Sequence, residues 1–166
     1  MKLFGTILLI CQLLTFHGQL EALFDIKKFR QGEQHFVETY LHIFGPSLLQ
    51  HRDTNVKNKK VEILLFIENK QKEIVDYKKH VIEGEVDHIN KNGILDLQRF
   101  FLVDGDYYLS LRLVDQNDTT NIEEHQQTFS LSKPNSVEFS DVELLDKYWK
   151  SDSVSKLNKS GFEMIP

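Results

Sequence analysis

Apolar and polar residues alternate along much of this chain, most clearly in residues 95–118 (LDLQRFFLVDGDYYLSLRLVDQND). Successive side chains of a β-strand point to opposite faces, so a half-buried strand alternates in this way. One face of the second half is entirely apolar and comprises Tyr107, Leu109, Leu111 and Leu113. Gly105 supplies the backbone freedom for a turn before this strand. The stretch therefore predicts two strands, 95–102 and 106–115, joined by a glycine turn.

The position of Tyr107 also fits a tyrosine corner. In that device a tyrosine near the start of a strand hydrogen-bonds back to the backbone at the edge of a β-sandwich. The alternative is an ordinary strand with a partly buried tyrosine. The corner and the alternation together are typical of an extracytoplasmic β-sandwich module.

The same period continues on both sides of this stretch. Residues 61–69 (VEILLFIEN) alternate, and Leu64 and Phe66 make the second face apolar as well, which predicts a central strand. Its expected hairpin partner is 73–82, and further strands are expected at 36–44, 127–131 and 137–145, with polar connections at 50–60 and 84–93. The fold class predicted is all-β, an immunoglobulin-like antiparallel β-sandwich of about seven strands.

The start of the chain predicts a targeting segment. Lys2 precedes a short apolar run, residues 3–16, which is too short for a membrane span and is typical of a secretory signal peptide. A buried N-terminal helix or strand is the alternative. We expect a signal peptide at 1–22, cleaved after Gly18 or Ala22, and a β-sandwich domain at 23–146. This domain opens with an exit segment of mixed character, 23–34, and its first strand is expected at 36–44. Residues 147–166 are expected to be a polar linker or the start of a further C-terminal region.

Cysteine content and charge narrow the picture further. Cys11, the only cysteine, lies inside the apolar run, so the mature chain would depend on its hydrophobic core without disulfides. The net charge of −5 gives no electrostatic case for binding nucleic acid or an anionic membrane. Lys57, Lys59 and Lys60 form a small basic patch, for which a solvated loop is expected. No second apolar run reaches the length of a span, so no membrane span is expected in the mature chain.

The sequence predicts no catalytic residue, no cofactor and no metal ligand. The segment Glu83–His88 gathers carboxylates and an imidazole, but no second ligand cluster accompanies it, which favours a solvated loop over a cation site. Residues 115–119 (DQNDT) begin like a calcium loop, yet Thr120 and Gln126 stand where an EF-hand has Gly and Glu. The seven histidines form no zinc pattern and no triad. We therefore expect no enzymatic activity in this segment.

Four segments carry a resemblance to a known family. They are FVETYL at 36–41, LDLQRF at 95–100, GDYYL at 105–109 and FSDVELL at 139–145. Together they resemble the N-terminal region of the GWxTD-domain proteins that gram-negative bacteria secrete. The resemblance implies a β-sandwich like immunoglobulin or macroglobulin modules, placed before the part that bears the Gly-Trp-x-Thr-Asp motif. That motif is absent here, and the single Trp149 lies in KYWK. The resemblance thus implies an N-terminal module that precedes the motif-bearing part, and it implies no activity and no functional residue.

The expected function is that of a non-enzymatic spacer or protein-binding module in the periplasm or outside the cell, with an unidentified protein partner at the cell envelope. Exposed sheet edges would be its contact surface, by strand addition. One alternative is a carbohydrate-binding module, with Tyr108 and Phe101 as candidate exposed aromatics. The other is an accessory domain of an enzyme whose catalytic part lies beyond residue 166.

Overall fold

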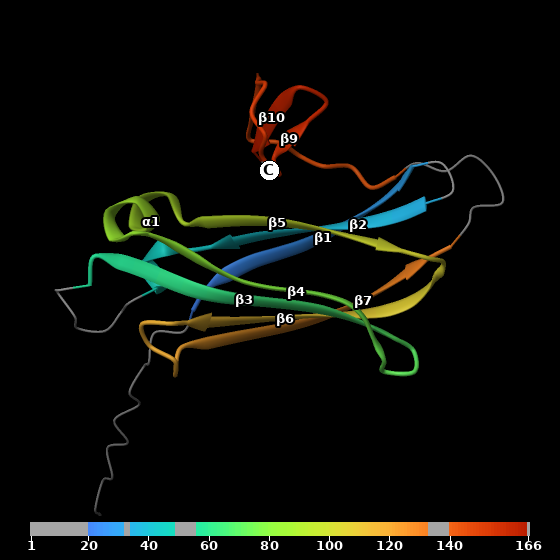
Figure 1. Cartoon of the computed structure of the whole chain (residues 1–166), viewed down its shortest axis with the longest axis horizontal. Coiled ribbons are helices and arrows are strands. Elements are labelled where there is room, and N and C mark those ends of the chain that lie inside the picture. The colour runs from blue at the N-terminus through green and yellow to red at the C-terminus, as the bar shows by residue number, and fades with distance from the viewer. Residues whose placement is uncertain (1–19, 32–33, 49–55, 133–139, 166) are drawn as a thin grey trace, which may run out of the picture.

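The predicted all-β sandwich is confirmed in the computed structural model, which describes residues 20–31, 34–48, 56–132 and 140–165 (Figure 1). Two antiparallel sheets form its layers. Sheet A has the strand order β1-β2-β5, and sheet B has the order β4-β3-β6-β7. Their bounds are β1 Ala22–Gln31, β2 Gln34–Ile43, β3 Asn58–Asn69, β4 Ile74–Glu85, β5 Ile94–Leu102, β6 Gly105–Asp115 and β7 Ile122–Leu131. A short helix, α1 (Val86–Asn92), connects β4 to β5.

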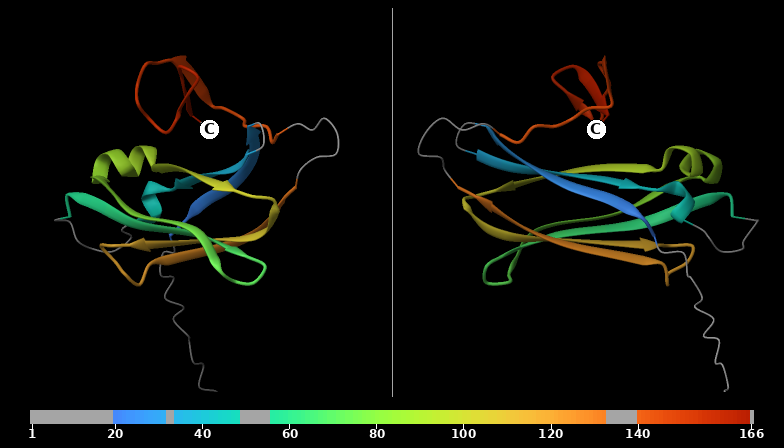
Figure 2. Two further views of the ribbon diagram at one scale, coloured as in Figure 1. Left: turned by 45° about the vertical axis from the view of Figure 1, so that its right-hand side comes forward. Right: turned by 180° about the vertical axis from the view of Figure 1, so that it is seen from behind.

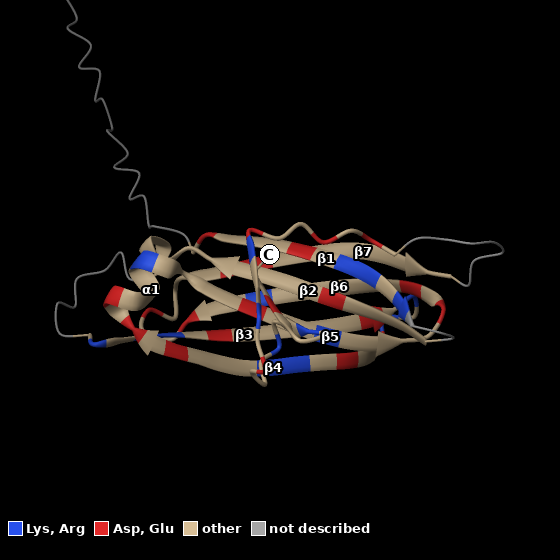
Figure 3. Ribbon diagram, turned by 90° about the horizontal axis from the view of Figure 1, so that it is seen from above, with Lys and Arg blue, Asp and Glu red and all other residues tan. Residues whose placement is uncertain are grey.

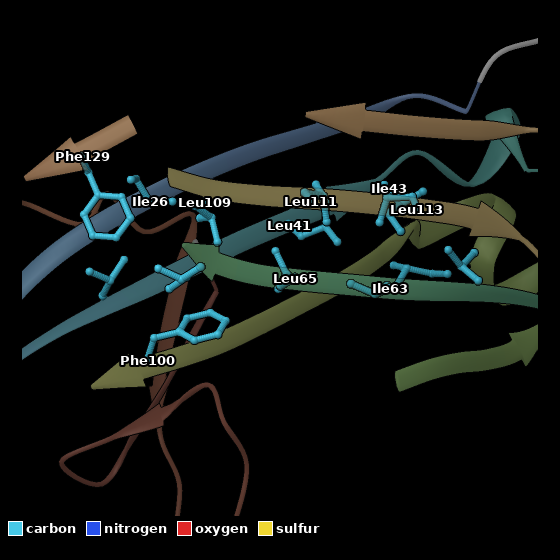
Figure 4. Packing of buried hydrophobic residues seen from close by; sticks show 14 of the residues in the cluster. Ile26, Leu41, Ile43, Ile63, Leu65, Phe100, Leu109, Leu111, Leu113 and Phe129 are labelled. Atoms are coloured by element: carbon cyan, nitrogen blue, oxygen red, sulfur yellow. The ribbon is translucent and has the colours of Figure 1, made fainter. Parts of the chain in front are cut away.

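Alternate residues of both sheets meet in one core between the layers (Figure 4). The predicted apolar face of β6 is buried, with Leu109 at 0% and Leu111 at 2% exposed. The β3 residues Val61, Ile63, Leu65 and Ile67 are all at 0% exposure. As the apolar second face of β3 predicted, this strand is central: it pairs with β4 on one side and β6 on the other.

The glycine turn before β6 crosses from one sheet to the other. The strands on either side of it, β5 and β6, therefore belong to different layers and do not form a hairpin. The Tyr107 hydroxyl donates a hydrogen bond to the Val103 carbonyl oxygen at 2.9 Å, which confirms the tyrosine corner. Burial, with the nearby charge of Asp104, raises the pKa of Tyr107 and keeps the hydroxyl a donor. The corner thus fixes the chain where it changes layers.

Two segments in which no strand or helix was expected are regular structure. The exit segment of mixed character, 23–34, contains most of β1, which pairs with β2 along its whole length and buries Ile26. The connection expected at 84–93 contains the end of β4 and helix α1. Charged residues obscured both elements: Lys27 and Lys28 interrupt the apolar period of β1, and α1 buries only Ile89.

The segment after sheet B also differs from expectation. Of the strand predicted at 137–145, residues 137–139 lie outside the described residues and residues 140–145 form no strand. Residues 147–165, expected to be a polar linker or the start of a further C-terminal region, form a second, small antiparallel sheet of order β8-β10-β9, with bounds β8 Lys147–Lys150, β9 Asn158–Lys159 and β10 Phe162–Ile165. Figure 2 shows this sheet on the outer side of sheet A. The predicted signal peptide falls mainly on residues 1–19, outside the described residues.

Lys59 overturns the expectation of a solvated basic loop. It lies in β3 at 2% exposure, and its Nζ donates to the carbonyl oxygens of Gly45 (2.8 Å) and Leu48 and to Asn90 Oδ1 (2.5 Å). A Cβ on Gly45 would stand 1.9 Å from the carbonyl oxygen of Ile89, so only glycine allows this approach to α1. The lysine therefore ties α1 and the turn after β2 to sheet B.

No helix among the described residues has the length and apolar character needed to cross a membrane.

Candidate functional site

The outer face of sheet A carries a buried ion network and a row of aromatic side chains. Its side chains come from every second residue of β1, β2 and β5, and the strand register aligns them in four cross-strand rows. The rows are Leu23–His42–Leu95, Asp25–Tyr40–Leu97, Lys27–Glu38–Arg99 and Phe29–Phe36–Phe101. The two outermost rows are mainly apolar, and the two rows between them contain the charged residues Asp25, Lys27, Glu38 and Arg99.

Glu38 is the centre of this face and is 1% exposed. Its Oε1 accepts from Arg99 Nε at 2.9 Å and from Arg99 Nη2. Its Oε2 accepts from the Tyr40 hydroxyl and from Lys159 Nζ, the latter at 2.6 Å. Lys159 Nζ also lies 2.7 Å from Glu143 Oε2. Both carboxylate oxygens of Glu38 are therefore occupied by donors, some from the sandwich and one from the C-terminal segment.

The electrostatics follow from this arrangement. Burial alone raises the pKa of Glu38, but the hydrogen bonds from Lys159, Tyr40 and Arg99 outweigh it and hold the pKa below its usual value. Burial and the neighbouring Glu38 carboxylate raise the pKa of Tyr40, so its hydroxyl stays protonated. The group is thus a charged carboxylate held by two cations and a phenol. Because one of the cations is Lys159, this group holds the C-terminal segment on the sandwich.

The C-terminal segment is attached at two further points. The Asp141 backbone N–H donates to the Lys28 carbonyl oxygen at 3.1 Å, and the Lys28 backbone N–H donates to Asp141 Oδ2 at 2.8 Å. Asp141 therefore occupies part of the outer edge of β1. Together with Lys159, this contact places residues 140–165 across sheet A (Figure 2).

A groove of about 490 Å³ lies between sheet A and this segment. Its walls are mainly apolar, with Leu95 and Leu97 on the sheet side and Val142, Leu144 and Leu157 on the segment side. Val142 and Leu144 are 73% and 83% exposed. The C-terminal segment thus covers sheet A over the ion network and leaves a hollow beside it.

The aromatic row lies at the other end of the same face. The rings of Phe29 and Phe36 stack at 5.2 Å between centroids, Phe36 and Phe101 are 6.0 Å apart, and the Arg99 guanidinium lies 4.9 Å from the Phe36 centroid. Phe101 is 54% exposed. Tyr108, the other aromatic proposed for sugar binding, lies on sheet B beneath Lys72 Nζ, 3.4 Å from its ring centroid. The two candidates therefore share no platform.

The outer face of sheet B contrasts with that of sheet A, because no described segment lies over it (Figure 1). On its β3 and β4 strands the aromatic Phe66 and Tyr77 lie side by side, and Val81 lies opposite Glu62. Tyr77 and Val81 are 63% and 52% exposed, and Val75 is 45% exposed. This exposed apolar surface lies next to the free edge of β4.

The polar clusters noted in the sequence do not converge. Glu83 lies on β4 and contacts Asn58 and Lys60 of β3, while His88 lies on α1 and contacts Asn92. Asp115 Oδ1 accepts the Asn117 backbone N–H at 2.8 Å and so closes a turn. Within the described ranges no three His, Cys, Asp or Glu residues are placed to hold a metal ion.

Two of the described histidines have acidic partners. His35 contacts Asp104 at 2.9 Å, and His80 contacts Asp96 at 3.2 Å, at different sites. His17 and His51 are outside the described residues.

The sequence did not single out the network that the structure places at the centre of sheet A, namely Glu38, Arg99 and Lys159. A charged residue inside the alternating FVETYLHIF strand was its only sequence signal.

Comparisons with known proteins give little beyond this. No protein-family model matches the chain, and no curated protein matches it. Among solved structures it is similar to the crystal structure of a Bordetella pertussis protein assigned as ApaA, with 10% sequence identity and a TM-score of 0.36. That similarity covers 71% of this chain and 96% of the other. No family assignment and no functional conclusion follow from this similarity.

Proposed function

We propose that this chain is a secreted, non-enzymatic β-sandwich module that holds the segment following it and offers its second sheet to a protein partner at the bacterial cell envelope. The observation that carries the proposal is the contrast between the two outer faces. Sheet A is covered by residues 140–165 through the buried Glu38, whereas sheet B presents exposed Val75, Tyr77 and Val81. Exposed apolar surface beside an unpaired edge strand is a recurrent protein contact.

The resemblance to the N-terminal region of GWxTD-domain proteins supports the same role. In such a protein the sandwich precedes the part that carries the family motif, and a fixed C-terminal segment would orient that part. The ion network around Glu38 supports this arrangement, because it ties Lys159 to the body of the sandwich. The spacer role and the binding role thus use different faces.

The binding role is tested by capture from envelope extract of cells that produce the chain. We expect the immobilised 166-residue chain to retain a partner that a Val81→Lys variant does not retain. Val81 is half-exposed, so the variant keeps the fold while placing a charge on the contact face. Equal retention by both proteins would contradict a contact at sheet B, and no retention by either would leave the spacer role alone.

The proposed secretion can also be tested, because the structure favours one of the two expected cleavage sites of the signal peptide. Leu20 is 1% exposed, and its backbone N–H donates to Asn121 Oδ1 at 2.7 Å. The Glu21 carbonyl oxygen accepts from the Phe44 N–H at 2.9 Å. Cleavage after Ala22 would remove these contacts and a buried leucine, at a cost of about 2 kcal/mol, so we expect cleavage after Gly18.

The measurement is the intact mass of the chain from the periplasmic fraction of a gram-negative host. A mature chain that begins at Gln19 is the expected result. A chain that keeps its full mass in the cytoplasm would overturn the secreted assignment, and one that begins at Leu23 would overturn only the cleavage site.

A carbohydrate-binding module is the second candidate, and the Phe29–Phe36–Phe101 row favours it. An aromatic row could stack against sugar rings. A glycan array compares the chain with its Phe101→Ser variant, and binding lost in the variant would support this role.

The third candidate, an accessory domain of an enzyme, would be supported by a catalytic region in the reading frame beyond residue 166.

A further inference from the structure

The edge of β4 has an arrangement of backbone groups that favours strand pairing. β4 is 12 residues long, and within the described chain its only ladder partner is β3. Val86 N donates to the Lys57 carbonyl oxygen at 3.1 Å, in register with the β3–β4 ladder. Lys57 and Val86 are therefore a hydrogen-bonded pair of the ladder. Such pairs recur at every second residue of an antiparallel ladder, so Ile82 and His80 also direct their backbone groups toward β3. Residues 77, 79, 81, 83 and 85 therefore direct theirs to the free edge.

The edge is accessible as well as unpaired. Figure 3 shows β4 along the margin of the molecule and beyond β5, with α1 turned inward from its end. The β4 side chains beside this edge are the exposed Val75, Tyr77 and Val81 of the outer face. The opposite arrangement holds at β1, whose outer edge is partly occupied by Asp141. Among the described residues no strand pairs with this edge of β4, so the edge is open to an approaching strand.

We propose that this edge pairs with β4 of a second copy of the chain, in an antiparallel ladder whose two-fold axis passes through Val81. The proposal names the partner of the contact face in the proposed function and rests on that function. In this register Val81 faces Val81 of the partner subunit, and Lys79 faces Glu83 of the partner subunit. The pairing would join the two four-stranded sheets into one continuous sheet.

Charge and apolar complementarity together select this register. An axis at Lys79 would oppose two lysines, and like charges directly opposite one another destabilise a ladder. An axis at Ile82 would pair Lys79 with Glu85. The same axis would, however, place the apolar Val81 against Glu83. The Val81 axis brings the two valines together and also forms two Lys79–Glu83 pairs.

The existing ion pairs fit this arrangement. Lys79 Nζ lies 3.1 Å from Glu62 Oε1, and Glu83 Oε2 lies 3.0 Å from Lys60 Nζ. Pairing would connect them into a chain of alternating charge: Glu62, Lys79, then Glu83 and Lys60 of the partner subunit. Lys79 and Glu83 would then each have neighbours of opposite sign on both sides.

Sedimentation velocity of the full chain, with single charge reversals, tests the register. We expect the chain to populate a dimer, and Lys79→Glu or Glu83→Lys alone to weaken dimerisation about tenfold or more, because each creates two like-charge contacts by symmetry. An equimolar mixture of the two variants should recover the dimer. In that heterodimer the two substituted side chains face each other with opposite charges, and the unsubstituted Lys79 and Glu83 form the second pair.

The matched control is Lys91→Glu, which makes the same charge change on the last turn of α1, away from the edge, and should dimerise as the parent chain does. Equal melting temperatures would show that the variants remain folded. A parent chain that stays monomeric, or variants whose mixture stays monomeric, would refute pairing through β4. A monomeric parent that still captures a different partner through Val81 would refute the second copy and leave the proposed function standing.

Discussion

Leu111→Asp is expected to unfold the domain. Leu111 is 2% exposed and pairs with Leu65 on β3 in the centre of the core (Figure 4). The substitution removes the buried leucine, at about 2–5 kcal/mol, and places a carboxylate among the apolar side chains of the core, at several kcal/mol more. Small domains are stable by only about 5–15 kcal/mol. The combined cost is comparable to the whole stability.

Arg112→Asp is the matched control, because it changes the next residue on the opposite face. The Arg112 side chain is 41% exposed, and its Nε lies 3.0 Å from Glu124 Oε1. Losing this exposed ion pair should cost about 1 kcal/mol or less. Circular dichroism and thermal melting compare both variants with the parent. If Leu111→Asp melted at the parent's temperature, the register of β6 deduced from alternation would be wrong.

Alternation identified β3, β4 and β6, because each buries one face against the core and shows it as a period of two. It could not show that β5 and β6 belong to different sheets, since a strand has the same pattern in either layer. β1 was missed because Lys27 and Lys28 interrupt its period, although Ile26 is buried. Local polarity thus conceals a strand whose order comes from pairing along its whole length with β2.

The candidate site could not be deduced from the sequence for a different reason. Glu38 resembles any polar residue on the solvent face of a strand. One of its two cationic partners, Lys159, is 121 residues away in the sequence. Segments rich in serine and lysine predict linkers, and no local signal indicated that residues 147–165 would fold back onto sheet A. The same distance makes the contact informative, because it shows where the chain beyond the sandwich is held.

Removing both cations beside Glu38 is expected to be the second severe change. Arg99 and Lys159 side chains are 41% and 21% exposed and can regain water, whereas the 1% exposed Glu38 side chain cannot. Replacing both with Leu therefore leaves a buried charge uncompensated, at about 3–5 kcal/mol. Adding Glu38→Leu should recover most of that loss, because a fully apolar trio needs no counter-charge. Urea unfolding of the double and triple variants measures both effects.

The pH dependence of the two proteins should have opposite signs. In the parent chain the pKa of Glu38 lies below its usual 4.5, so its contribution is present above that pH and is lost as the pH falls through the folded-state pKa. In the Arg99→Leu, Lys159→Leu variant only the Tyr40 hydrogen bond still opposes burial, and burial is the stronger of the two, so the pKa of Glu38 rises. Acidification then neutralises the stranded carboxylate, and the stability gap between variant and parent should narrow below about pH 5. A gap that stays constant down to about pH 3 would show that the carboxylate is not what the two cations stabilise.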